Sequence, residues 1–116
     1  MTNHTSEPTL RLRIYIGESS RHHHQPLYHA IVLKAREMGL AGITVMRAVE
    51  GFGPSSRIHA ANLLSLSGDL PIVIEAVDLE ERINALLEAL EGMIDHGLIT
   101  TDAVHVRRYG SSHTMS

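Results

Sequence analysis

The chain has 116 residues, a length that suits one domain, and 43% of them are hydrophobic, so we expect a folded globular protein. It contains no cysteine, which excludes a disulfide framework, thiolate zinc sites and cysteine nucleophiles, and which fits a reducing, cytoplasmic location. The formal charge of −3 argues against a general nucleic-acid binder, because such proteins need a basic surface.

Neither a signal peptide nor a membrane insertion is predicted. Residues 1–9 are polar and form a flexible tail without an apolar run. No stretch approaches the roughly 20 apolar residues that a bilayer span needs. With no Trp and a single Phe, the core is expected to be aliphatic. A chain this short buries a limited core and often gains stability by oligomerising.

The first half of the chain predicts a strand, a helix and a second strand. In residues 10–16 aliphatic side chains alternate with polar or aromatic ones, which is typical of a half-buried strand. Pro26 can open a helix because its missing N–H is not needed in the first turn, and Gly39 can end it. Residues 43–49 alternate again and predict a strand that stops at the glycine-rich residues 51–54.

The second half begins with a long connection, residues 55–69. Connections longer than about 12–15 residues are uncommon in compact domains and are usually functional or disordered. Residues 70–77 are apolar on both faces, which predicts a central strand or one covered by a neighbouring subunit.

A helix and a last strand complete the predicted elements. Asp78 is expected to cap a helix whose apolar stripe runs from Ile83 to Ile94. Val104 and Val106 alternate with polar neighbours and predict the last strand, before a polar, flexible tail over residues 110–116.

The order strand, helix, strand, long loop, strand, helix, strand predicts an α+β, ferredoxin-like βαββαβ fold. Its sheet would be antiparallel and four-stranded, with both helices on one face and the long loop between strands two and three. Since the third strand is apolar on both sides, the open face of the sheet is expected to be covered in an oligomer.

The root of the long loop is the first candidate site. Gly51 and Gly53 allow backbone N–H groups to approach an anion. Ser55, Ser56 and Arg57 supply hydroxyl and guanidinium donors suited to phosphate. The alternative is a strand-ending turn whose glycines serve geometry alone, since a lone GxG is found in many turns.

Two further groups are candidates by position. Arg107 and Arg108 end the last predicted strand, either as a solvated pair or as cations that complete the loop-root site of a neighbouring subunit. Glu18 and Ser19 follow a strand and precede a helix, a usual place for ligand contacts, although a plain polar turn explains them equally well.

Histidines gather in one short run, His22, His23 and His24. Imidazoles bind zinc, copper or nickel, so a metal site is one interpretation. Adjacent loop histidines cannot all point the same way and no second motif has ligand spacing, so a solvated loop is the other. No Ser-His-Asp set is marked, and the paired carboxylates fall on one predicted helix, so we expect no enzymatic activity.

Several short motifs occur in order along the chain: Gly17-Glu18-Ser19, Pro26-Leu27-Tyr28, Gly39-Leu40-Ala41-Gly42, Glu50-Gly51-Phe52-Gly53, Ser55-Ser56-Arg57-Ile58-His59 and Asp69-Leu70-Pro71. Over residues 10–109 they resemble an uncharacterised-protein family within the PII-like signal-transduction superfamily. The Gly-Phe-Gly element before a long loop is also similar to that of the PII nitrogen regulators.

The resemblance implies a homotrimer that binds an adenine nucleotide as an effector in the clefts between subunits, with no tightly bound cofactor. It implies that the loop 51–69, the counterpart of the T-loop, docks on a partner, often a membrane transporter or channel. The resemblance implies phosphate contacts at Gly51, Gly53 and Ser55, cations Arg107 and Arg108 from a second subunit, and Gly97 as a loose match to the family's second glycine turn. Together with the residues singled out above, the predicted nucleotide contacts also include Phe52, Ser56, Arg57, Glu18 and Ser19. Within this loop, the residues that we expect to bind the partner are Ile58, His59, Leu63 and Leu64.

Two departures from the PII pattern bear on the ligand. Gly97 is followed by Leu98 where PII proteins have lysine, and Pro54, Ser55 and Ser56 stand where they have basic and amide residues. Both changes remove contacts to distal phosphates, so AMP or ADP is expected in preference to ATP. Two alternatives stay open: a metal-binding, metal-tolerance trimer that uses residues 22–24, and a small α+β-barrel enzyme.

Overall fold

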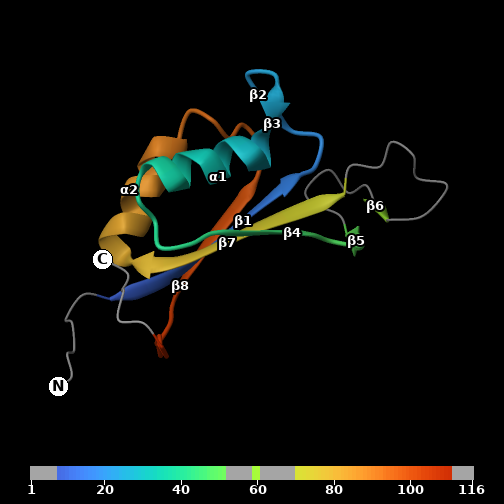
Figure 1. The fold of residues 1–116 in the computed structure, drawn as a ribbon. Coiled ribbons are helices and arrows are strands. Elements are labelled where there is room, and N and C mark those ends of the chain that lie inside the picture. The colour runs from blue at the N-terminus through green and yellow to red at the C-terminus, as the bar shows by residue number, and fades with distance from the viewer. Residues whose placement is uncertain (1–7, 52–58, 61–69, 111–116) are drawn as a thin grey trace.

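The computed structural model describes residues 8–51, the backbone of 59–60, and residues 70–110. Its helices and strands are labelled in chain order in Figure 1. They are β1 (Thr9–Gly17), β2 (Arg21–His22), β3 (Gln25–Pro26), α1 (Leu27–Glu37), β4 (Thr44–Arg47), β5 (Glu50–Gly51), β6 (His59–Ala60), β7 (Pro71–Leu79), α2 (Glu80–Leu90) and β8 (Leu98–Ala103).

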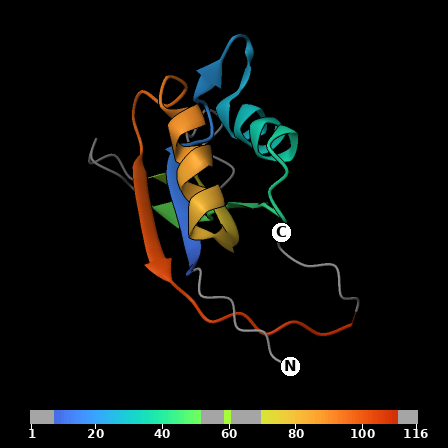
Figure 2. The same cartoon turned by 90° about the vertical axis from the view of Figure 1, so that its left-hand side faces the viewer.

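Four of these strands form one antiparallel sheet in the order β4-β7-β1-β8. β1 pairs along its whole length with β7, so that Gly17 lies opposite Pro71, and on its other side with β8. Both helices cover the same face of the sheet (Figure 2). The predicted fold class, α+β with a ferredoxin-like strand and helix order, is confirmed.

The alternation of β1 decides which face of the sheet is buried. Leu12 and Ile14 are fully buried under the helices, together with Ile72 and Ile74 of β7. Burial of one such side chain contributes about 1.5–3 kcal/mol. The remaining members of this aliphatic core are Ile16, Leu27, Ile31, Ala35, Ala76, Ile83, Leu86 and Leu90.

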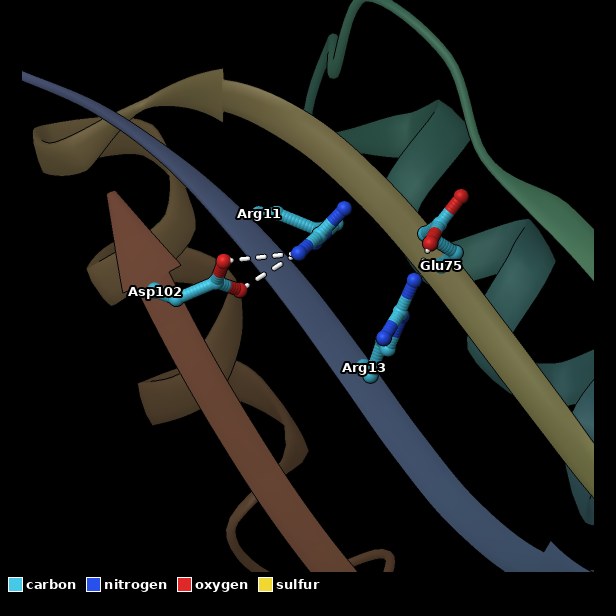
Figure 3. A network of polar contacts seen from close by, with 4 residues as sticks. All are labelled: Arg11, Arg13, Glu75 and Asp102. Carbon is cyan, nitrogen blue, oxygen red and sulfur yellow. Dashed lines mark hydrogen bonds and ion pairs between the residues drawn. The ribbon is translucent and has the colours of Figure 1, made fainter. Parts of the chain in front are cut away.

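The outer face of the sheet carries two cross-strand ion pairs (Figure 3). The Arg11 guanidinium donates to both oxygens of Asp102 on β8, at 3.1 and 2.7 Å. Arg13 donates to Glu75 on β7 at 2.9 Å, and this hydrogen bond raises the pKa of Arg13 above its ordinary value. Both arginines are therefore matched by carboxylates within the same sheet.

The last strand lies earlier than predicted, at residues 98–103 and not at the alternating residues 104–107. Ala103 is already opposite Leu10, near the start of β1. The Val104 N–H still donates to the Thr9 carbonyl at 3.1 Å, and the chain then passes the end of its partner strand. The β-branched residues that do pair, Ile99, Thr100 and Thr101, show no alternation in the sequence.

The predicted helix cap at Asp78 is wrong. The residue before α2 is Leu79, which makes no capping hydrogen bond through its side chain. The alternation of β7 continues to Asp78, whose carboxylate is fully buried and accepts the N–H groups of Leu79 at 2.7 Å and Ala41 at 2.9 Å. Asp78 thus fixes the connection between α1 and β4. The helix itself ends at Leu90, one turn before the predicted Ile94.

The turn at the root of the long loop differs from the prediction in one respect. Pairing was expected to stop at Gly51, yet Glu50 and Gly51 form a two-residue antiparallel ladder with His59 and Ala60. The rest of the long connection, residues 52–58 and 61–69, lies outside the described residues.

Candidate ligand site at one end of the sheet

Four segments that are far apart in the sequence meet at one end of the sheet. β1 ends at Gly17 opposite the start of β7, and the N–H of Glu18 donates to the Leu70 carbonyl at 2.8 Å. β4 ends beside the same segment, where the Ala48 N–H donates to the Pro71 carbonyl at 2.9 Å. Leu98, at the start of β8, lies opposite Tyr15. We call this region the strand-end surface and define it by Glu18, Arg47, Gly51, Pro71 and Gly97.

Glu18 and Arg47 form an ion pair on this surface. The two side chains are 2.6 Å apart, with Glu18 28% exposed and Arg47 58% exposed. Glu18 lies in the turn after β1, which is closed by a hydrogen bond from the Ser20 N–H to the Gly17 carbonyl at 3.2 Å. Arg47 is not among the residues singled out from the sequence. The signal that could have identified Arg47 is a basic residue at the end of a strand, four positions before a glycine turn.

The two glycines of the surface are close to neighbouring atoms. A Cβ on Gly51 would lie 3.1 Å from the Pro71 ring. A Cβ on Gly97 would lie 3.1 Å from the Tyr15 carbonyl oxygen and 3.1 Å from Ile16. Both positions therefore favour glycine, because a side chain would crowd the Pro71 ring in one case and the backbone of Tyr15 in the other.

The structure brings together three of the predicted site residues, Glu18, Gly51 and Gly97. Ser19 is exposed in the turn beside Glu18. His59 contributes its backbone to the ladder with Gly51. The other predicted loop residues, Phe52, Gly53, Ser55, Ser56, Arg57, Ile58, Leu63 and Leu64, lie outside the described residues.

Arg107 and Arg108 follow the end of β8, at the end of the sheet opposite to the strand-end surface. Their segment leaves β8 beside Thr9, at the start of β1, whereas Glu18 follows the end of β1. A nine-residue strand spans about 27 Å. Within one subunit these arginines are therefore remote from Gly51, and they can meet the strand-end surface only as side chains of another copy.

The histidine run forms a β-hairpin of its own. β2 and β3 pair through His22 and Gln25, which leaves His23 and His24 as the two-residue turn. Both have positive φ, 49° and 72°, as a type I′ turn requires. The rings of His22 and His23 meet edge to face at 4.1 Å. In the described part of the chain, no three His, Asp or Glu side chains are placed to hold a metal ion.

Comparison with known proteins places the chain in a family. Residues 9–106 match the profile of the DUF190 family, described as uncharacterized ACR. A UPF0166 protein of Aquifex aeolicus is 39% identical over 95 residues, which cover 82% of this chain and 90% of that protein. A UPF0166 protein of Methanocaldococcus jannaschii is 33% identical over 96 residues, with 82% and 88% covered.

The chain belongs to the DUF190 (UPF0166) family.

The fold of this DUF190 protein is that of PII-like proteins. CPII of Thiomonas intermedia, solved with ADP and bicarbonate, has a TM-score of 0.64 at 21% identity, with 87% of this chain and 90% of CPII covered. The GlnK–ATP complex of B. subtilis has a TM-score of 0.57 at 10% identity, with 87% and 85% covered. The divalent ion tolerance protein CutA1 of Ehrlichia chaffeensis has a TM-score of 0.59 at 8% identity, with 90% and 88% covered.

The prediction of an uncharacterised-protein family is confirmed by the DUF190 match, and the prediction of a PII-like fold is confirmed by the solved structures. These solved structures share the fold and little of the sequence, so the ligands in them do not transfer to this DUF190 protein by similarity alone. Among the residues that the structure describes, no helix has the length and apolar character needed to cross a bilayer.

Proposed function

We propose that this protein is a cytoplasmic PII-like regulator that senses an adenine nucleotide, AMP or ADP in preference to ATP. The nucleotide binds in clefts between the subunits of a homotrimer. Its binding selects the shape of the loop 51–69, and that shape decides whether a partner binds. The partner is a membrane transporter or channel, so the protein acts in signal transduction that regulates ion transport.

The observation that carries this proposal is the strand-end surface. It brings the bare backbone of Gly51 and Gly97 to the same end of the sheet as the cation of Arg47. Backbone N–H groups and a guanidinium are the donors that bind phosphate. CPII, whose fold is similar, was solved with ADP and bicarbonate.

A second subunit is needed to complete the site. Within one chain the strand-end surface has no arginine from the last segment, because Arg107 and Arg108 leave the sheet at its other end. In a ring of subunits they would face the Gly51 and Gly97 turns of a neighbour. Their charge would then lie beside the nucleotide phosphates.

The preference for AMP or ADP follows from the donors that are missing. No lysine follows Gly97, and the loop root has Pro54, Ser55 and Ser56 in place of basic side chains. A third phosphate would therefore add negative charge without adding a charged partner.

Calorimetric titration with AMP, ADP, ATP and cyclic di-AMP tests the proposal. We expect micromolar binding of AMP or ADP, weaker binding of ATP, and loss of heat in Arg107→Ala and Arg108→Ala. Arg36→Ala, an exposed arginine on α1, is the matched control and should bind as the wild type does. If none of the four nucleotides gives heat with the wild type, the nucleotide-sensor function is wrong.

The second candidate is metal binding through His22, His23 and His24, which one hairpin holds close together, with the ring centroids of His22 and His23 4.1 Å apart. The proposal for it is a metal-tolerance trimer of the same fold. Titration of the nucleotide-free protein with Zn²⁺ and Cu²⁺ separates the two functions. Stoichiometric binding that is lost when the three histidines are replaced, with no nucleotide binding, would favour metal.

A further inference from the structure

The strand-end surface carries more carboxylates than cations within one subunit. Its cation is Arg47, and the Glu18 carboxylate lies 2.6 Å from that guanidinium. Arg21, three residues after Glu18, donates instead to the His24 carbonyl at 3.3 Å. Glu50 is exposed at the start of β5, and no cation in the described part of the chain pairs with it. One guanidinium and two carboxylates therefore border this end of the sheet.

Glu18 and Glu50 approach the start of β7 from opposite sides, because β7 lies between β1 and β4 in the sheet. On the β1 side, the Glu18 N–H donates to the Leu70 carbonyl at 2.8 Å. On the β4 side, Glu50 precedes Gly51, where a Cβ would lie 3.1 Å from the Pro71 ring. Both acidic residues thus border the surface where we propose that phosphates bind.

The charge of Glu18 is held in place. Its own N–H bonds to Leu70, and the turn that contains it is closed by the hydrogen bond from the Ser20 N–H to the Gly17 carbonyl. The Glu18 side chain is 28% exposed, against 58% for Arg47. Arg47 is therefore the partner that solvent and a ligand reach first. A ligand that contacts Arg47 meets the Glu18 carboxylate beside it, where salt screens it less than a fully exposed charge.

A fixed charge acts on a ligand in proportion to the charge of the ligand. Each terminal phosphate has a second pKa near 6, so AMP, ADP and ATP carry about two, three and four negative charges at pH 8. Where the charges of Arg47 and Glu18 cancel, an added phosphate gains no attraction from the pair. Beside Glu50 an added phosphate is repelled.

We infer that Glu18, and to a smaller extent Glu50, determine specificity by rejecting the more highly charged nucleotides. The inference rests on the proposed function, and it names the residues that set the preference for AMP or ADP over ATP. Glu50 contributes less because it is exposed, so solvent and salt screen its charge. The discrimination then comes from charges that are present and can be removed one at a time.

Calorimetric titration at pH 8 with AMP, ADP and ATP tests the inference on the wild type, Glu18→Gln and Glu50→Gln. In about 50 mM salt we expect Glu18→Gln to raise the affinity about threefold for AMP, fivefold for ADP and ninefold for ATP, because the gain grows with ligand charge. Glu50→Gln should give the same order with smaller gains. In about 0.5 M salt the differences should shrink.

Two further variants separate charge from shape. Glu18→Asp keeps the carboxylate and should keep the ranking of the wild type. Glu37→Gln removes a carboxylate that pairs with Lys34 on α1, on a different element, and should change none of the three affinities. Thermal unfolding of every variant checks that each one is folded at the temperature of the titration.

The outcomes distinguish this inference from the proposed function. Equal gains for the three nucleotides in Glu18→Gln, a loss of affinity, or a Glu18→Asp variant that behaves as Glu18→Gln does would each overturn the inference and leave the nucleotide sensor standing. A wild type that binds ATP more tightly than AMP would overturn it as well. A wild type that binds none of the three would overturn both.

Discussion

The Arg47 guanidinium lies 2.6 Å from the Glu18 carboxylate although their strands, β4 and β1, are not neighbours in the sheet. β7 lies between these two strands, so the ion pair spans the width of β7 near the first residues of that strand. The ion pair thereby links the turn after β1 to the segment that leads into the long loop. A ligand that binds Arg47 in place of Glu18 would break this link at the root of the loop.

The first prediction concerns Glu18→Gln. It removes the charge that neutralises Arg47, so an anionic nucleotide should bind more tightly. An exposed ion pair contributes at most about 1 kcal/mol, which limits the gain in affinity to about fivefold. The dissociation constant for ADP, measured by calorimetry at low and high salt, checks this.

Glu37→Gln is the matched control for Glu18→Gln, because Glu37 pairs with Lys34 on α1, on a different element of the fold. It should leave the affinity unchanged. If Glu18→Gln weakens ADP binding, Glu18 contacts the ligand directly and does not act through Arg47.

The second prediction concerns Gly97→Ala. The added methyl group would lie 3.1 Å from the Tyr15 carbonyl oxygen, a backbone atom held in the sheet, and 3.3 Å from Ile94. We expect the free energy of unfolding, measured by urea denaturation, to fall by about 1–3 kcal/mol. Gly92→Ala is the control, because nothing lies within 4 Å of its Cβ position. Equal stability of the two variants would contradict the tight turn.

The two central strands could be predicted because their burial is visible in the local sequence: β1 alternates between apolar and polar residues, and β7 is largely apolar. Both strands lie within one residue or two of the predicted limits. The position of the edge strand β8 could not be predicted, because its residues Leu98–Ala103 are all exposed and their sequence does not alternate. Its position follows from the register with β1, which is a long-range property of the folded chain.

The candidate site was predictable in part for the same reason. Glycines at strand ends are visible in the sequence, and Gly51 and Gly97 lie at the same end of the sheet, Gly51 beside β7 and Gly97 beside β1. The ion pair of Arg47 with Glu18 depends on strand order and could not be read from spacing. Asp78 was misplaced because an acidic residue before a helix also fits the pattern of a cap, whereas here the strand continues through it.

The third prediction concerns Asp78→Ala. The carboxylate is fully buried and accepts the N–H groups of Ala41 and Leu79, both of which would lose their partner. A hydrogen bond to a charged group contributes about 1.5–3 kcal/mol, and these two donors are only partly shielded from water, so we expect a loss of about 3 kcal/mol in the free energy of unfolding. Asp78→Asn keeps one acceptor oxygen and should lose about half as much.

Chemical denaturation with Glu88→Ala as the control checks the loss at Asp78. Glu88 is exposed on α2, so its removal should change stability by no more than about 0.5 kcal/mol. If Asp78→Ala is as stable as this control, the carboxylate does not hold the α1–β4 connection.

The fourth prediction concerns the outer face of the sheet. Val73 lies between Tyr15 of β1 and Met46 of β4 on that face. If other subunits cover it, Val73→Glu buries an unpaired carboxylate and should raise the dissociation constant of the assembly by about 100-fold or more. Sedimentation velocity checks this against Ala85→Glu, an exposed position on α2. An unchanged mass for Val73→Glu would show that this face is in contact with solvent.

The fifth prediction separates the fold of the histidine hairpin from any metal function. His23 and His24 both have positive φ, which a side chain disfavours and which Asn-Gly adopts readily in a type I′ turn. We therefore expect His23→Asn/His24→Gly to raise the free energy of unfolding by about 1 kcal/mol. The nucleotide affinity should stay as in the wild type, because the turn lies outside the strand-end surface.

Thermal unfolding with and without Zn²⁺, alongside calorimetry with ADP, measures both effects on this variant. His29→Asn on α1 is the control, since it removes an exposed imidazole without touching the turn. A wild type that Zn²⁺ stabilises strongly, with the gain lost in the turn variant and kept in His29→Asn, would assign the hairpin to metal. Two strained histidines would then be retained at the turn for binding and at a cost in stability.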